Sequence, residues 1–385
     1  MAAEKNEYLV DVAGERHYQS QTRPYREAFT KWRNHDKNKY GYRFVHDSRE
    51  HTYIDGEGFA DKQCKTAETK ALHSCLQFLG LIMLIFLVLE QLSSLILILM
   101  YDRGHITWNY FSQRAQDYLV PSEQVFLYCG LKLFSIATII TISDMVLKLP
   151  RQVVIPHERQ KPAYLISGTS LILILTIILR IFDYGTSNLF AAVNIDSTYY
   201  SYISTDSTQS QILFFIFELI LIPALTELFF RGMILQLFRQ FGDNFAIIIS
   251  SLAAACCYHE MSKIFFIFIL SMALGVFTVK SGSVFPAIAA KVLSLNLTYL
   301  LNSFTLLKNR ASVRMTGALL SIVLLALFTI ILLMLHGKLI RPFKLEHDTT
   351  EMDMRQKSRQ LLNSSWCVIW LTAALLTAIV SLRFI

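Results

Sequence analysis

The chain of 385 residues is 53% hydrophobic and only 17% charged, whereas soluble domains carry about 25% charged residues. Long windows contain almost no charge, which is typical of a polytopic membrane protein and excludes an ordinary soluble core. The formal net charge of +7 is explained by basic loops that face anionic lipid, and no recognition motif accompanies it. We therefore expect membrane lipids as partners and no nucleic acid.

Residues 1–70 form a polar, basic segment with many aromatic side chains, which argues against pure disorder. Within it, "PYREAFTKWRNH" (24–35) is compatible with a short amphipathic helix on the inner membrane face. The alternative is a partly ordered tail without chemistry. Between these two, we favour the tail.

Apolar windows follow, and each is about long enough to cross a hydrocarbon layer of ~30 Å, except for the short fifth one. They lie at roughly 76–100, 124–147, 163–182, 211–238, 244–260, 262–280, 284–306, 315–337 and 366–384. We predict an all-α fold, a polytopic transmembrane helix bundle of about nine spans. Strands are not expected, because an open sheet cannot satisfy its backbone in lipid.

The chain divides into four segments: a basic N-terminal segment (1–70), first transmembrane helices (76–182), a core (205–306) and C-terminal transmembrane helices (307–385). The last segment contains a charged connection, 345–365, which we expect to form a helix on the cytoplasmic surface before the final span.

The distribution of Lys and Arg among the loops predicts the orientation. The N-terminal segment and the loops 148–162 and 336–344 are basic, whereas the loop 184–210 contains no Lys or Arg. These segments alternate correctly if the N-terminus is cytoplasmic. The loop 307–314 is basic on the opposite side, but the other loops outweigh it. We predict an integral, multi-pass membrane protein with a cytoplasmic N-terminus.

Polar residues interrupt the apolar stretch "LIPALTELFFRGMILQLF" (221–238) at Thr226, Glu227 and Arg231. Glu227 and Arg231 are four residues apart, so they share a helix face with the glutamate on the N-terminal side, the better order for an ion pair. An unpaired charge in lipid is costly, so mutual pairing accounts for both.

Three more polar residues follow. His259 and Glu260 lie at the end of the next helix, and Lys291 lies in the middle of a later apolar window. A lysine at such a position needs water or a counter-ion, and Glu227 or Glu260 can provide one.

Three segments occur in a characteristic order: "PALTELFFRG" (223–232), "SSLAAACCYH" (250–259) and "VKSGSVFPAIAAKVLSLN" (279–296). Together they resemble the CPBP family, the Abi or CAAX-protease-like group of intramembrane endopeptidases, which includes the CAAX prenyl endopeptidases. The family motifs are E-E-x-x-x-R, F-x-x-x-H, and H-x-x-x-N or D after a G-S-x-x-P-A-I signature. The resemblance covers roughly residues 205–305.

The resemblance implies which residues would be catalytic. Glu227 takes the position of the second glutamate, Arg231 that of the arginine and His259 that of the first histidine, although Ala255 replaces the motif phenylalanine. These three are the catalytic residues that the chain retains.

Three other motif positions are substituted. Thr226 stands where the family has its first glutamate, the presumed base that activates water. Lys291 stands at the second histidine and Leu295 at the final Asn or Asp, with Asn296 one residue further and rotated about 100° around the helix.

These substitutions affect the chemistry that the family performs. Loss of a general base costs about 10²–10⁴-fold and loss of one oxyanion donor about 10²–10³-fold. Two replacements are conceivable: Glu227 turns toward the water, or a desolvated Lys291 activates Thr226 as a nucleophile. One Glu and one His are too few ligands for zinc, so we expect no metal and no cofactor.

The leading hypothesis is a protease-derived membrane protein, weakly active or inactive (a pseudoenzyme), that binds a transmembrane or lipidated polypeptide. The first alternative is an active intramembrane endopeptidase that uses Glu227, Arg231 and His259. The second is a transporter with a buried Lys291–Glu227 pair, although the paired halves typical of transporters are not evident. Whether the protein is an enzyme therefore stays open at the level of the sequence.

Overall fold

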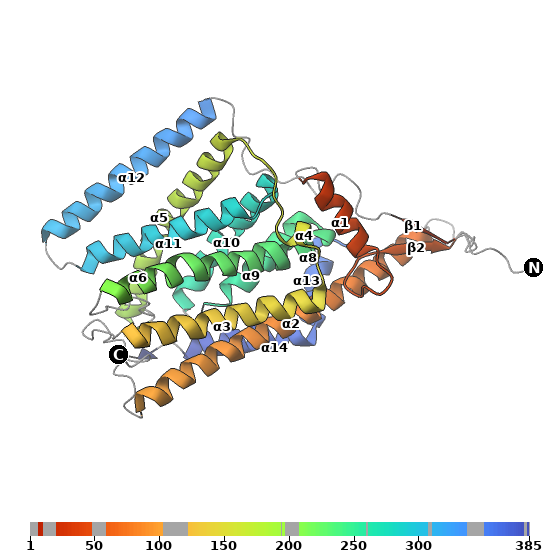
Figure 1. The fold of residues 1–385 in the computed structure, drawn as a ribbon, viewed down its shortest axis with the longest axis horizontal. Coiled ribbons are helices and arrows are strands. Elements are labelled where there is room, and N and C mark those ends of the chain that lie inside the picture. Colours follow the sequence, from red (N-terminus) through yellow and green to blue (C-terminus); the bar gives the residue numbers. More distant parts are fainter. Residues whose placement is uncertain are drawn as a thin grey trace, which may run out of the picture.

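The computed structural model describes residues 7–10, 21–47, 59–102, 122–193, 195–196, 208–258, 261–306, 310–336, 350–380 and 383–384. Most of these residues belong to long helices that lie side by side in a bundle (Figure 1). The α-helices are α1 (Arg23–Arg33), α2 (Phe59–Asp102), α3 (Ser122–Leu147), α4 (Arg151–Val154), α5 (Pro162–Ala192), α6 (Thr208–Ile216), α7 (Ile222–Glu227), α8 (Leu235–Phe238), α9 (Asp243–Ala255), α10 (Met261–Ser281), α11 (Phe285–Leu306), α12 (Arg310–His336), α13 (Met354–Asn363) and α14 (Ser365–Val380).

The expectation that strands would be missing is wrong at the ends of the bundle. The strand β1 (Glu7–Val10) pairs antiparallel with β2 (Phe44–Asp47), and β3 (Ile195–Asp196) pairs antiparallel with β4 (Arg383–Phe384). The first pair extends beyond the bundle on the side of the N-terminus (Figure 1). Both pairs adjoin helix ends, so neither has to satisfy its backbone within a spanning segment.

Each predicted apolar window contains a helix, but nine spans are not confirmed. In the described part of the chain, five helical segments are long and apolar enough to cross a membrane: Lys65–Ile96, Val125–Leu147, Pro162–Asp183, Gln211–Phe241 and Lys263–Ser281. A sixth is added if α13 and α14, which meet at 80°, count as one broken span. The helix Asp243–Ala255 shows why an apolar window need not be a span: its 13 residues extend only about 20 Å, which is less than a hydrocarbon layer of ~30 Å.

Two connections differ from the expectations. The loop predicted at 184–210 begins with the last turns of α5, which continues to Ala192. The charged connection 345–365 does contain a helix, α13, at a steep angle to α14. The cytoplasmic side of either connection, and the division of the chain into four segments, stay predictions.

In the described part of the N-terminal segment the short amphipathic helix forms and packs against the bundle, so the favoured tail is wrong for residues 21–47. The helix α1 buries Tyr25, Phe29 and Trp32 in the main hydrophobic core. The indole nitrogen of Trp32 donates a hydrogen bond of 2.8 Å to the carbonyl oxygen of Leu147, at the end of α3. The aromatic side chains that argued against disorder thus attach the segment to the helix bundle.

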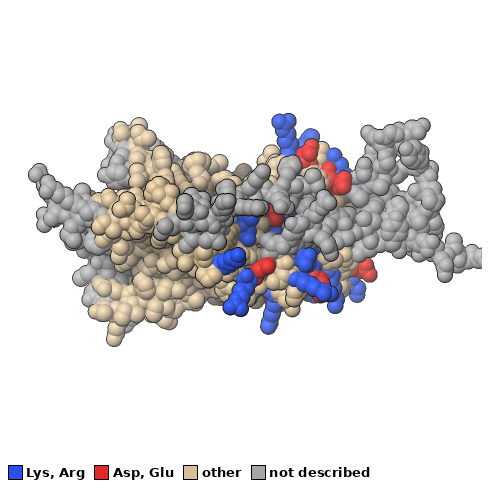
Figure 2. Space-filling view, turned by 90° about the horizontal axis from the view of Figure 1, so that it is seen from above, with Lys and Arg blue, Asp and Glu red and all other residues tan. Residues whose placement is uncertain are grey.

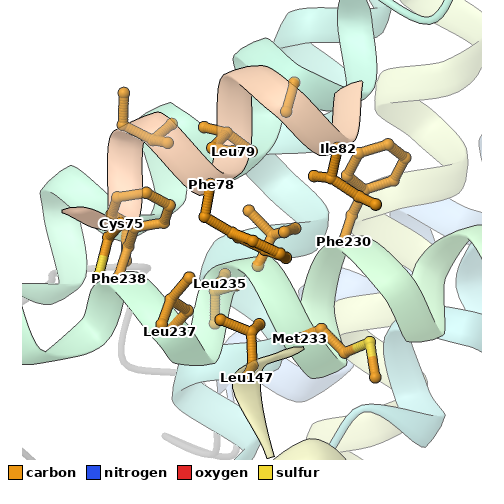
Figure 3. Packing of buried hydrophobic residues seen from close by; sticks show 14 of the residues in the cluster. Cys75, Phe78, Leu79, Ile82, Leu147, Phe230, Met233, Leu235, Leu237 and Phe238 are labelled. Carbon is orange, nitrogen blue, oxygen red and sulfur yellow. The ribbon is translucent and has the colours of Figure 1, made fainter. Parts of the chain in front are cut away.

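The main hydrophobic core includes the contact between α2 and the helical segment that ends at Phe241. In Figure 3, side chains of α2 face those of the later segment and Leu147; the labelled residues are Cys75, Phe78, Leu79, Ile82, Leu147, Phe230, Met233, Leu235, Leu237 and Phe238. Because lipid is as apolar as these side chains, the close packing itself stabilises the contact.

A second kind of contact occurs where residues 236–243 meet the N-terminal segment; we call this region the 236–243 junction. The hydroxyl of Tyr25 donates a hydrogen bond of 2.6 Å to Gln236 Oε1. Arg239 and Asp243 form an ion pair of 2.7 Å, and the Arg239 side chain is fully buried.

The same junction also contacts residues 40–42 and α13. The amide of Tyr42 donates to Gln240 Oε1 at 2.7 Å, while Gln240 Nε2 donates to the carbonyl oxygen of Tyr40 at 2.9 Å. Lys357 of α13 donates to the carbonyl oxygen of Phe241 at 2.5 Å. The junction therefore joins segments from both ends of the chain.

Charged side chains are concentrated at this end of the molecule. Figure 2 shows Lys, Arg, Asp and Glu gathered over one half of the visible face, on the side of the N-terminus, whereas the described part of the other half is formed by other residues. This separation is typical of a membrane protein with one charged, water-facing end.

Candidate functional site

The predicted site lies on a helix of unusual geometry. Residues 208–241 form continuous helical structure in which two π-helical turns, η3 (Phe217–Leu221) and η4 (Leu228–Ile234), flank α7. Single π-helical turns within α-helices are frequent at functional sites. Thr226 and Glu227 are the last residues of α7, and Arg231 lies in η4.

Glu227 and Arg231 form the ion pair that their spacing predicts. Arg231 Nε lies 3.3 Å from Glu227 Oε2, and both side chains are almost completely buried. Arg231 Nη2 also donates to the carbonyl oxygen and hydroxyl of Ser271 in α10, at 2.7 and 2.6 Å. The arginine thus links the helix that carries the predicted site to α10.

Thr226 makes hydrogen bonds only within its own helix in the described part of the chain. Its half-buried hydroxyl lies 3.0 Å from the carbonyl oxygen of Ile222 and 2.8 Å from that of Pro223. A threonine that bonds to the preceding turn in this way acts as a donor to the backbone.

Lys291 does not form the predicted pair with Glu227. Among the described residues no carboxylate forms an ion pair with Lys291, and Glu227 pairs with Arg231 instead. The buried Lys291 lies with Nζ 5.8 Å from the ring centroid of Tyr258, within range of a cation–π interaction. His259 and Glu260, the two other polar residues expected nearby, lie outside the described residues.

Leu295 and Asn296 differ in what they contact. The half-buried Leu295 has no polar group to offer. Asn296 Nδ2 donates to the carbonyl oxygen of Leu219 at 3.3 Å. Its shorter hydrogen bond, of 2.8 Å, goes to the carbonyl oxygen of Val292 in its own helix. Asn296 therefore links α11 to the π-helical turn η3.

Sequence reasoning missed a second ion pair close to this position. Lys132 of α3 and Glu218 of η3 lie 2.7 Å apart, with the Lys132 ammonium also 4.6 Å from the ring centroid of Tyr128. Lys132 and Glu218 both interrupt apolar windows. The rule that singled out Glu227 and Lys291, a charged residue within an apolar window, would have found them.

Glu90 is another charged residue in an apolar window that the sequence analysis did not consider. It belongs to α2, is half-buried and interacts electrostatically with Cys257, two residues beyond the end of α9. Glu90 thus adds a carboxylate near the segment that continues to His259.

The acidic, histidine and cysteine side chains of the described residues do not form a metal site. No group of three or more of them lies close enough together to hold a metal ion. Glu227 is instead paired with Arg231.

Comparison with known protein families identifies the central part of the chain. Residues 208–294 match the family described as Type II CAAX prenyl endopeptidase Rce1-like. The chain contains a CAAX prenyl endopeptidase (CPBP) family domain. No curated protein and no solved structure matches the chain.

The matched residues of the CPBP domain begin at the first residue of α6 and end inside α11. They include Thr226, Glu227, Arg231 and Lys291, whereas Leu295 and Asn296 lie just beyond them. The resemblance inferred from the motifs is therefore confirmed at the level of the family domain.

Gly232, which follows Arg231 in the motif, has a structural role in the CPBP domain. A Cβ atom at this position would lie 2.5 Å from the carbonyl oxygen of Val154, the last residue of α4. Any larger residue would push α4 away from η4, because a backbone atom cannot rotate out of the contact as a side chain can.

Proposed function

We propose that this CPBP-family membrane protein binds a transmembrane or lipidated polypeptide and cleaves it weakly or not at all. One observation carries the proposal: the hydroxyl of Thr226, at the position of the family's first glutamate, is engaged by the carbonyl oxygens of Ile222 and Pro223. A hydroxyl group with an ordinary pKa that donates to its own backbone is a poor base for water.

The retained polar groups favour binding over hydrolysis. Arg231 is held by Glu227 and Ser271, so its position is fixed by two helices. In peptide hydrolysis the oxyanion needs preorganised donors, but Leu295 offers none. The Glu227–Arg231 pair is held in position, but Thr226 replaces the base and fewer oxyanion donors are present. Such a site is suited to hold a polypeptide in place.

The family match supports one class of polypeptide. The matching family is described as a prenyl endopeptidase, and such enzymes act on prenylated chains at a membrane. We infer that a prenyl group or a transmembrane segment brings the ligand to the CPBP domain of this protein.

The test is a cleavage and cross-linking assay on the full-length protein in proteoliposomes. A farnesylated CAAX peptide that carries a photoreactive group should cross-link to the protein, and its non-prenylated form should compete poorly. Cleavage of the same peptide should not exceed that of empty liposomes. The triple variant Thr226→Glu, Lys291→His, Leu295→Asn should gain measurable cleavage, because it restores the base and the oxyanion donors.

A matched single variant sharpens the assay. Thr226→Glu alone should remain inactive, since Lys291 and Leu295 still replace the oxyanion partners. Robust cleavage by the native protein, abolished by Glu227→Gln, would contradict the proposal. Absence of cross-linking to both prenylated and transmembrane peptides would contradict its binding part.

An active endopeptidase is the second candidate, favoured by one feature of Glu227. Its Oε2 atom lies 3.3 Å from Arg231 Nε but makes no hydrogen bond of acceptable geometry with a described residue. A carboxylate oxygen in this state can accept a proton from water, and that would move the role of the base to Glu227. The Glu227→Gln variant separates this candidate from the first.

A further inference from the structure

A cavity of about 440 Å³ opens on the surface away from the CPBP motif residues, between residues 39–40 and the helices α2, α3 and α14. This volume lies within the roughly 300–1,000 Å³ of ligand sites. Lys39 and Leu81 are both exposed at its edge, so the cavity is accessible from outside the bundle.

The cavity is polar at one end and apolar at the other. Lys39, His73 and Gln77 line the end that lies toward the charged part of the molecule. Along α2, Leu81 and Ile85 follow one and two turns further into the span Lys65–Ile96. A ligand that fits both ends must be polar at its head and apolar along its length.

The helix α3 also contributes to the apolar end of the cavity. Val146 and Ile142 line the cavity, and α3 ends at Leu147. Ile142 is therefore more than one turn deeper in the bundle than Leu147. The apolar wall thus continues along two neighbouring helices, both of which contain candidate membrane spans.

We propose that this cavity is a binding site for an anionic phospholipid. The headgroup phosphate lies at Lys39, His73 and Gln77, and one acyl chain lies along Leu81, Ile85 and Ile142. None of the described residues that line the cavity is acidic, whereas its polar end carries the ammonium group of Lys39 and the imidazole of His73. This complementarity selects a lipid with net negative charge over a zwitterionic one.

Trp366 makes the site measurable, because its indole also lines the cavity. The full-length protein is reconstituted in vesicles that contain increasing fractions of a phospholipid with brominated acyl chains, which quench nearby tryptophans. The protein has four tryptophans, so the contribution of Trp366 is the difference between native protein and Trp366→Phe.

Brominated phosphatidylserine should reach half-maximal quenching of Trp366 at a roughly fivefold lower mole fraction than brominated phosphatidylcholine. Lys39→Ala should abolish this preference and Lys39→Arg should retain it. Lys37→Ala is the matched control, since Lys37 is exposed, two residues away, and does not line the cavity.

Three results would overturn the proposal. Equal quenching by the two lipids would show that the headgroup is not selected. An equal loss of preference in Lys37→Ala would show attraction to the charged surface in general. Quenching of Trp366 that becomes weaker as more protein is added per vesicle, together with cross-linked dimers, would show that a second copy of the chain occupies the cavity.

Discussion

Two regions of one continuous helical segment differ in how their buried polar groups are satisfied. At the 236–243 junction, Gln236, Arg239 and Gln240 bond to the N-terminal segment or to neighbouring turns. Around Glu227 and Arg231, by contrast, Glu227 Oε2 and Arg231 Nε and Nη1 make no hydrogen bond with a described residue.

The difference holds for the named residues of the junction, while buried side-chain atoms without a hydrogen bond to a described residue also occur in the N-terminal segment, at Gln21 Nε2 and Arg26 Nε. A satisfied buried network stabilises and fixes a unique arrangement of segments. An unsatisfied buried group in a native structure requires another explanation, and binding of a ligand is one. Gln236 belongs to both regions, since it accepts from Tyr25 and donates to the carbonyl oxygen of Arg231 at 3.0 Å.

The largest effect is expected from Arg239→Leu. The change leaves Asp243, whose side chain is 13% exposed, without its partner, and should lower the free energy of unfolding by about 3–5 kcal/mol. Thermal unfolding in detergent measures the loss. Arg23→Leu is the control, because Arg23 and Glu27 form an exposed pair with the same spacing, and it should leave the midpoint unchanged. Equal losses would show that burial at the junction does not matter.

A pH-dependent loss is expected from Tyr25. Burial raises the pKa of Tyr25 from 10.0 to about 12. The unfolded chain then releases this proton at lower pH than the folded one. The contribution of this group to the free energy of unfolding is fully present below pH 10. It falls by about 3 kcal/mol as the pH rises from 10 to about 12.

Unfolding of the native protein and of Tyr25→Phe, compared between pH 9 and pH 11, checks this effect. The variant loses the hydrogen bond to Gln236 but should be less sensitive to the rise in pH. A parallel decline of both proteins would assign the pH dependence to other groups.

A smaller effect is expected at the pair that supports the π-helical turn η3. Lys132→Met leaves Glu218 without the ammonium group at 2.7 Å and should destabilise the protein by about 1–2 kcal/mol. The double variant with Glu218→Gln should be more stable than the single one, because it removes both charges. If the two changes are simply additive, the ion pair contributes nothing beyond its separate side chains.

The smallest effect is expected from combining Lys291→Met with Glu227→Gln. Since Glu227 pairs with Arg231 and not with Lys291, the two losses of stability should add to within about 0.5 kcal/mol. Denaturation of the two single variants and the double variant measures the coupling. A coupling of more than 1 kcal/mol would place the two residues in contact and would revive the transporter hypothesis.

The sequence could predict the contacts of the candidate site that join residues close together on the same helix. Glu227 and Arg231 pair because residues four apart share a helix face, whatever surrounds the helix. The partner of Lys291 could not be predicted, because it depends on the rotation of α11 against other helices. The hydrogen bond from Asn296 to the carbonyl oxygen of Leu219 could not be predicted for the same reason.

The sequence by itself determined the helical class, the membrane character and the family of the central domain, because hydrophobic windows and short motifs are local properties of the chain. Only the tertiary structure decided which windows are long enough as helices to span a membrane, and that residues 21–47 pack against the bundle through Tyr25 and Trp32. It also decided which polar groups acquire partners. Such contacts join residues as distant as Tyr25 and Gln236, and their geometry depends on how whole helices pack rather than on the pattern of any one of them.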